Sequence, residues 1–258
     1  MELRLKLSRV DGSELPVNYQ YYISSWIYNV IAQADAGHST FLHDRGYEFG
    51  FRTFKLFTFS HLDIRPFQIV GNKIRVLGNE MILIVRFLVD ASLETFVKGL
   101  FIEQQGFIGS GPNRVDFRVT SVDVIAKPQF KETMRYRCLS PMVVSTRRDD
   151  GSVAYLDPLD RRFASAFMQN LIRKHHAVSV YNEIALEDDW SSYPFSLRVI
   201  GLPRKKGVTI KEGLPDQTKV IGHLFNFELR APEILQEIGY YAGFGEKNSM
   251  GFGCGTYE

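Results

Sequence analysis

The sequence predicts an α+β protein in which one βαββαβ order of elements occurs twice. Three observations lead to this fold class: strand-like alternation opens each half, helix-period runs follow it, and the same order recurs after a short linker at residues 127–129. The βαββαβ order defines the ferredoxin-like (RRM-like) domain. We therefore expect two such domains in tandem, over residues 1–126 and 132–258, related in pattern and not in recognisable sequence identity.

In the first half, residues 2–8 form the first expected strand because Leu3, Leu5 and Leu7 alternate with polar residues. A helix should follow Pro16, with Asn18 as its cap and its end near Gly37. The further expected elements are a short turn at 39–44, extended segments at 54–60, 67–70, 74–76 and 81–88, a helix capped by Asp90 and a strand at 115–125 with a register break.

The second half repeats this order. Its expected elements are a strand at 136–145, a helix at 160–176, strands at 195–200, 208–211 and 219–229, a helix opened by Pro232, and a last strand at 252–257. The second helix should end near Gly243, so the run GFGEKNSMGFG lies between it and the last strand.

Composition limits the class of protein. The chain has 258 residues, of which 45% are hydrophobic, so it can bury one large core or two ordinary ones. A net charge of +2 is too mild to indicate a nucleic-acid partner by itself. Cys138 and Cys254 lack metal-ligand or redox spacing, and neither a signal sequence nor an apolar run of about 18 residues is present. We therefore expect a cytoplasmic protein without a membrane partner.

The glycine run is the most informative local feature. Two Gly-aromatic-Gly pairs flank polar residues, and glycine costs about 0.5–1 kcal/mol relative to alanine in ordered structure. Its presence there indicates that backbone is presented to a close-approaching molecule, with a polyanion as the obvious candidate. The residues that we expect to bind it are Gly243, Gly245, Lys247, Asn248, Ser249, Gly251 and Gly253.

Three side chains in the first half are candidates for chemistry. His43 follows the first helix beside Asp44, where a side chain of near-neutral pKa stays accessible, although a lone histidine is more often structural. Tyr28 lies off the apolar helix face, so it either reaches a site or is an ordinary aromatic residue. Lys55 interrupts an extended apolar segment, so either its stem snorkels past Phe57 or its ammonium faces an anion.

Several basic clusters are present, and each is most often a solvated face. The most interesting one is Arg204, Lys205 and Lys206, in an expected turn bounded by Pro203 and Gly207 between two strands, where a hairpin could follow a phosphate backbone. No histidine pair has HExxH spacing, and the glycine run has neither the ending of a Walker loop nor the topology of a Rossmann fingerprint. We expect no metal and no cofactor.

These segments resemble one family. LPVNYQYYISSWIYNVI, STFLHD, KLFTFS and the glycine run together are similar to the CRISPR-associated endoribonucleases of the RAMP superfamily, which cut repeat RNA into guide RNAs. The resemblance covers nearly the whole chain and implies two tandem ferredoxin-like domains. It also implies that Tyr28, His43 and Lys55 are catalytic, although the histidine-to-lysine spacing is looser here and Arg45 or Arg52 could share the role of the lysine.

The resemblance implies metal-independent cleavage, because RNA supplies its own 2'-hydroxyl nucleophile. His43 would act as acid or base, Tyr28 would position or transfer a proton, and Lys55 would stabilise the transition state, giving 2',3'-cyclic phosphate and 5'-hydroxyl ends. The implied partner is CRISPR repeat RNA, with other effector subunits and a homodimer left open. Two alternatives also stay open: an inactive RAMP subunit that holds guide RNA, and a scaffold with an incidental glycine turn.

Overall fold

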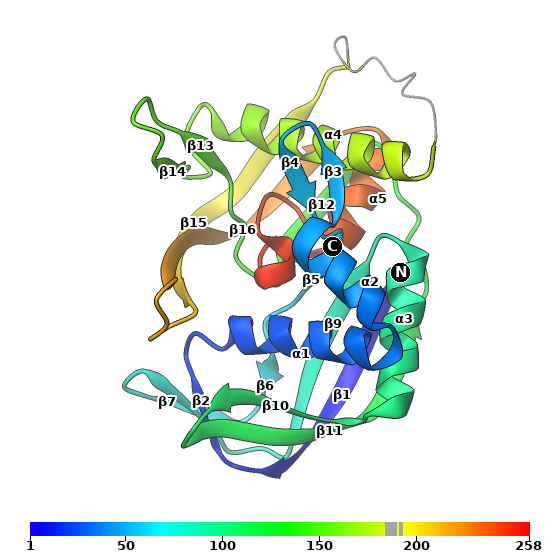
Figure 1. Ribbon diagram of the computed structural model, residues 1–258. Helices are drawn as coiled ribbons and strands as arrows, with labels where there is room; N and C mark the ends of the chain where they lie inside the picture. The colour runs from blue at the N-terminus through cyan, green and yellow to red at the C-terminus, as the bar shows by residue number, and fades with distance from the viewer. Residues whose placement is uncertain (184–189, 191–192) are drawn as a thin grey trace.

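Two larger antiparallel sheets, each with two helices packed on one face, form the framework of the computed structural model, which describes residues 1–183, 190 and 193–258 (Figure 1). The first sheet contains β1 (Glu2–Asp11), β5 (Phe57–Phe59), β9 (Glu80–Phe87) and β11 (Asn113–Ile125), in the order β11-β1-β9-β5. Helices α1 (Gln20–Ala34) and α3 (Asp90–Ile102) connect β1 to β5 and β9 to β11. This strand order and connectivity are those of a ferredoxin-like domain.

The first domain also carries smaller strands around this frame. β10 (Gln105–Ser110) extends the sheet beyond β11, and β6 (Asp63–Ile64) pairs with β9. β2 (Glu14–Pro16), β7 (Phe67–Val70) and β8 (Lys73–Val76) form a separate sheet, whose β7–β8 hairpin turns at the expected Gly71-Asn72.

The second sheet has the same arrangement. Its strands are β12 (Thr133–Cys138), β15 (Ser196–Ile210), β16 (Thr218–Arg230) and β17 (Gly255–Tyr257), in the order β15-β16-β12-β17. Helix α4 (Phe163–Tyr181) follows β12, after a small hairpin of β13 (Ser145–Arg147) and β14 (Val153–Tyr155), and helix α5 (Glu233–Ala242) follows β16. The prediction of two tandem ferredoxin-like domains is therefore confirmed.

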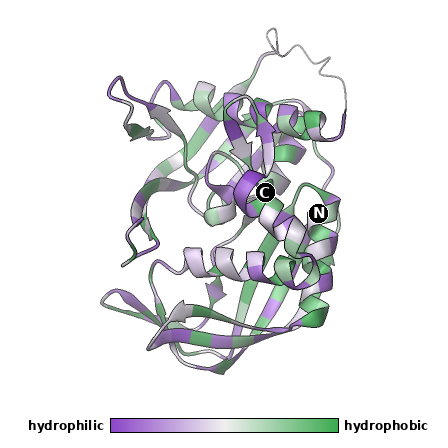
Figure 2. Cartoon of the chain, viewed as in Figure 1, coloured by the Kyte–Doolittle hydropathy of each residue, from purple (hydrophilic) through white to green (hydrophobic). Residues whose placement is uncertain are grey.

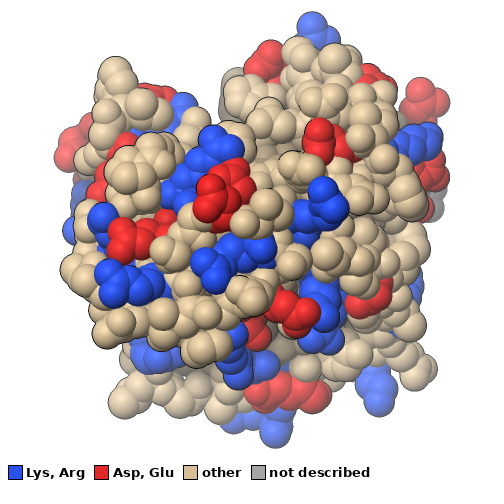
Figure 3. Space-filling view, turned by 90° about the horizontal axis from the view of Figure 1, so that it is seen from below, with Lys and Arg blue, Asp and Glu red and all other residues tan. Residues whose placement is uncertain are grey.

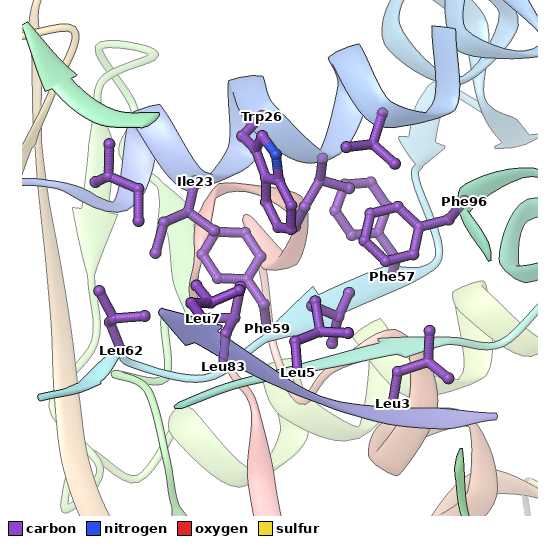
Figure 4. Packing of buried hydrophobic residues seen from close by; sticks show 14 of the residues in the cluster. Leu3, Leu5, Leu7, Ile23, Trp26, Phe57, Phe59, Leu62, Leu83 and Phe96 are labelled. Carbon is purple, nitrogen blue, oxygen red and sulfur yellow. The ribbon is translucent and has the colours of Figure 1, made fainter. Parts of the chain in front are cut away.

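The alternation of apolar and polar residues along β1 directs its leucines into the core of the first domain. Leu3, Leu5 and Leu7 are fully buried and point toward α1 and α3, where Trp26 and Phe96 meet edge to face (Figure 4). Burying one such leucine contributes about 1.5–3 kcal/mol. Hydrophobic and hydrophilic residues intermingle along the strands and helices, as expected where each element has one buried face (Figure 2).

Some local predictions were wrong, and tertiary contacts explain why. Asn18 does not cap α1, because its side chain bonds the Thr209 amide at 3.1 Å and Glu212 at 2.9 Å in the second domain. Asp90 is the first residue of α3 and not its cap, which is Val89. No helix in the described parts of the chain is long and apolar enough to cross a membrane.

The expected turn at Arg204, Lys205 and Lys206 is also absent. These residues lie inside the continuous strand β15 and pair with β16 after a register shift that follows Ile200. The segment Gly201-Leu202-Pro203 forms a β-bulge between the two paired parts of β15. The residues that favoured a turn in the sequence therefore mark an irregularity within one long strand.

Two segments join the domains beside the first helix. The glycine run lies between α5 and β17 and contains a one-turn 3-10 helix, η2 (Asn248–Met250), which packs on α1 and β5. The hairpin of β3 (Tyr47–Phe49) and β4 (Arg52–Phe54) reaches from the first domain to α4 (Figure 1). These two segments flank the candidate site.

Candidate functional site

Tyr28, His43 and Lys55 come from three separate elements and lie together. Tyr28 is on α1, His43 is on the π-helical turn η1 (Phe41–Arg45) that follows α2 (Ala36–Thr40), and Lys55 is in the connection between β4 and β5. The Tyr28 and His43 rings meet edge to face with centroids 5.4 Å apart, and Lys55 Nζ donates to the His43 carbonyl at 2.7 Å. The structure thus brings the three residues together around a π-helical turn, a local structure often found at functional sites.

Gly46 makes this closeness possible. It ends η1 with φ +70°, and a Cβ there would lie 2.5 Å from the Phe54 carbonyl oxygen and 3.0 Å from the Lys55 side chain. Only glycine fits both the left-handed backbone and the close approach. Lys55 therefore neither snorkels past Phe57 nor projects from a strand: it crosses over Gly46 to the His43 backbone.

The three side chains differ in environment. The His43 side chain is 70% exposed, and its Nδ1 lies 2.8 Å from Asp44 Oδ1. Burial raises the pKa of Tyr28 to about 12, and a hydrogen bond with Ser249 acts against that shift. Burial lowers the pKa of Lys55, while the carboxylates of Asp44 and Glu48 act against that change. At neutral pH the Tyr28 phenol therefore keeps its proton and is available as a donor.

The glycine run lies mostly inside the protein, which differs from the expectation of an exposed backbone. Gly243, Gly245, Gly251 and Gly253 are buried with φ between +72° and +88°. A Cβ on Gly245 would lie 2.3 Å from the Val143 carbonyl oxygen, and one on Gly253 would lie 1.9 Å from the Phe244 carbonyl oxygen. The close neighbours that these glycines admit are segments of this chain.

Lys174 holds this loop from inside. Its side chain on α4 is buried, and its ammonium donates to the carbonyls of Gly243 at 2.6 Å and Gly245 at 2.7 Å and to Asn248 Oδ1 at 2.7 Å. Burial lowers the pKa of Lys174 to about 7, and Glu246 acts against that shift. The Asn248 amide also donates to the Phe244 and Phe252 carbonyls, so this residue is engaged internally.

The outward side chains of the loop face the catalytic candidates. Lys247 is exposed with φ +57°, and Ser249 bonds with Tyr28. A pocket of about 290 Å³ lies between the loop and the β4–β5 connection. Its lining residues include Arg52, Lys55, Glu246, Lys247 and Ser249. Three of these are cationic side chains against one carboxylate, which suits a polyanion, and Lys174 also lines the pocket but its ammonium is held by the glycine loop.

The cluster Arg204, Lys205 and Lys206 lies outside this pocket. Lys206 lines a second pocket, shared with His61 and Arg65 from the first domain. Acidic and basic side chains are mixed on the face seen from below, so charge alone does not mark a nucleic-acid surface there (Figure 3). Among the described residues, no group of three or more His, Cys, Asp or Glu side chains is placed to hold a metal ion.

Two structural features beside the candidate site were not predicted from the sequence. Lys174 is not among the residues singled out from the sequence, although it lies seven residues after Phe167 and three after Leu171 on the buried face of α4. The β3–β4 hairpin fills the loose spacing between His43 and Lys55, and its Phe49-Gly50-Phe51 turn was a recognisable signal.

Comparisons with known proteins agree along nearly the whole chain. The family model described as CRISPR associated protein Cas6, C-terminal, matches residues 125–256, and that described as CRISPR-associated protein Cas6, N-terminal, matches residues 14–122. The CRISPR-associated endoribonuclease Cas6 1 of Methanocaldococcus jannaschii is 30% identical over 256 residues, which cover 98% of this chain and 91% of the relative.

Solved structures show the same fold. The structure from the characterization of a Cas6-related gene of Pyrococcus furiosus has a TM-score of 0.82 at 23% identity and covers 100% of this chain and 98% of that one. A structure described as CRISPR associated protein Cas6 has a TM-score of 0.73 at 28% identity, with 100% and 99% covered. Because one model spans more than half of the sequence and a relative matches nearly all of it, the chain belongs to the Cas6 family of CRISPR-associated proteins.

Proposed function

We propose that this chain is an endoribonuclease that cleaves CRISPR repeat RNA without a metal ion. The observation that carries the proposal is the grouping of Tyr28, His43 and Lys55 beside a pocket lined by cationic side chains. The name of the M. jannaschii relative, an endoribonuclease, supports it. RNA brings its own nucleophile, so a base, an acid and a cation near the scissile phosphate are sufficient.

The side chains divide the reaction among them. A base removes the 2'-hydroxyl proton, the oxygen attacks the adjacent phosphorus, and the bond to the 5'-oxygen breaks as an acid protonates that oxygen. His43 is the group for acid or base work, because Asp44 binds Nδ1 and leaves Nε2 for the substrate. Tyr28 donates a hydrogen bond, and Lys55 stabilises the charge that develops on the phosphoryl oxygens. The products carry 2',3'-cyclic phosphate and 5'-hydroxyl ends.

The rest of the substrate lies along both domains in this proposal. Lys247 and Ser249 contact RNA from the glycine loop, whose internal glycines and Asn248 keep its shape. Arg204, Lys205 and Lys206 contact phosphates farther along β15. We place the domain division between residues 126 and 132, so the proposed catalytic side chains belong to the first domain and Lys247 to the second.

The test uses labelled repeat RNA from a CRISPR array of the source genome, incubated with the purified protein in EDTA. Cleavage should occur at one position and stop when the nucleotide at the cut site is 2'-deoxy. His43→Ala should slow cleavage by about 10²- to 10⁴-fold and leave RNA binding largely intact. His38→Ala serves as the matched control, since His38 lies nearby and bonds Ser92 at 3.0 Å.

Two results would contradict the proposal. Cleavage of the 2'-deoxy RNA, or loss of cleavage in EDTA, would reject the metal-independent mechanism. Tight binding by the native protein without a discrete product would instead identify an inactive subunit that holds RNA.

A further inference from the structure

The hairpin between His43 and Lys55 stands next to the proposed reaction centre. Strands β3 and β4 pair from Tyr47 with Phe54 to Phe49 with Arg52, and Gly50 and Phe51 form the connection. Gly50 has φ +60° as the first residue of this connection, the pattern of a type II′ turn. β4 ends at the residue before Lys55, and three residues separate β3 from His43, so the hairpin adjoins both catalytic candidates.

The hairpin is fixed at its base. The Tyr47 ring is 1% exposed and meets Tyr181 of α4 edge to face at 4.8 Å. The Phe49 ring packs on His176 of the same helix at 4.7 Å. Since α4 belongs to the second domain, the hairpin spans the two domains and its tip has a defined position.

The tip presents an aromatic ring to solvent beside cationic groups. Phe51 is fully exposed, with a relative accessibility of 108%, so it contributes nothing to either core. Its neighbours Arg52 and Thr53 line the pocket that also contains Lys55 and Lys247. A single exposed apolar residue is ordinary, but this one lies on a two-residue turn next to a basic pocket, in a hairpin whose base packs on α4.

We propose that Phe51 and Arg52 form a subsite for a nucleotide that flanks the scissile phosphate. Phe51 stacks on the base, and Arg52 pairs with a phosphate oxygen. An aromatic ring next to cationic side chains is the combination that binds single-stranded RNA, because every base offers a π-face and every nucleotide a charge. This subsite rests on the proposed function, since it takes the same RNA as the catalytic residues.

The experiment measures binding of repeat RNA that is 2'-deoxy at the cut site. Native protein is compared with Phe51→Ala, Phe51→Trp and Phe101→Ala, the last being a matched control because Phe101 is 80% exposed on α3, outside the pocket. A second RNA series carries one abasic nucleotide at each position around the cut in turn, so that binding identifies which base is stacked.

Phe51→Ala removes one stacking contact and should weaken binding by about 5- to 150-fold, while Phe51→Trp and Phe101→Ala should bind like the native protein. With the abasic nucleotide at the stacked position, native protein and Phe51→Ala should bind equally, because the two changes remove the same contact.

The outcomes separate this subsite from the proposed function. If native protein binds and cleaves the normal RNA but Phe51→Ala binds within about twofold of it, the subsite is refuted and the nuclease stands. A binding loss by Phe51→Ala that persists on every abasic RNA also refutes stacking. If native protein neither binds nor cleaves repeat RNA, the proposed function fails and this inference fails with it.

Discussion

Replacing Lys174 with methionine tests whether a buried ammonium shapes the glycine loop. Lys174→Met keeps a side chain of similar length but removes three hydrogen bonds of 2.6–2.7 Å to Gly243, Gly245 and Asn248. The loop carries Lys247 and Ser249, so a change in its shape moves the side chains that face Tyr28 and the pocket. We expect lower stability and slower cleavage together.

The expected loss in the free energy of unfolding follows from the three acceptors that lose their donor. Each buried acceptor without a donor costs about 1–3 kcal/mol, so three give about 3–9 kcal/mol as an upper range. Methionine avoids the cost of burying an ammonium, which is large enough to lower the pKa of Lys174 to about 7, and the loop can relax toward water. We therefore expect a net loss of about 2–4 kcal/mol in the free energy of unfolding.

Urea denaturation measures this loss. With a slope of about 3 kcal/mol per molar urea, the midpoint should fall by about 1 M. Arg173→Met is the matched control, because Arg173 precedes Lys174 on α4. Its guanidinium donates only a long hydrogen bond of 3.4 Å to Gln169 Oε1, so its loss should change stability little. If Lys174→Met unfolds within about 0.5 kcal/mol of the native protein and cleaves repeat RNA at the native rate, the internal role of Lys174 is refuted.

Two further predictions concern the same loop. The pKa of Lys174 is about 7 in the folded chain, against an ordinary value of 10.5. Between these two pH values the unfolded chain therefore binds more protons than the folded chain. The contribution of Lys174 to the free energy of unfolding should accordingly rise with pH over this range. The difference in unfolding free energy between native protein and Lys174→Met should grow by up to about 1.4 kcal/mol per pH unit from pH 7 to 9; a constant difference would contradict the shift. Gly251→Ala should cost about 2–4 kcal/mol in thermal or urea unfolding, because φ is +88° and the new Cβ would lie 2.8 Å from Phe59. Gly213→Ala, with φ +81° and open space, is the control for the backbone cost alone, and equal losses in both variants would show that the contact with Phe59 is unimportant.

Periodicity was sufficient for the fold because each domain buries one face of each central element. Leu3, Leu5 and Leu7 mark their strand by alternation, and the helices carry their own apolar faces. Where a predicted helix boundary was wrong, contacts with distant parts of the chain explain the difference. Asn18 favours a helix cap locally, but its hydrogen bonds to Thr209 and Glu212 depend on the second domain.

The candidate site was predictable only in part for the same reason. Local context made Tyr28, His43 and Lys55 separate candidates, but nothing in their spacing shows that their elements meet, and only the resemblance to a family implied that they act together. The glycine run was noticeable in the sequence, yet which neighbour approaches each glycine depends on segments as distant as Val143 and Phe59. A lysine on a buried helix face could have been flagged, although its three acceptors could not.

The glycine loop also couples the proposed RNA contacts to the packing of the two domains. Thr58 of the first domain donates to the Phe252 carbonyl at 3.0 Å, and Lys174 holds the loop from the second domain. Elsewhere in the interface, fully buried Arg86 bonds Glu2 at 2.8 Å and lies 3.6 Å from the centre of the Tyr240 ring. Catalysis by positioning is sensitive to displacements of about 1 Å, so the distance from Lys247 to the catalytic candidates depends on this buried interface. The glycines therefore serve the proposed reaction by letting two domains pack closely enough to present one site, more than by exposing backbone to RNA.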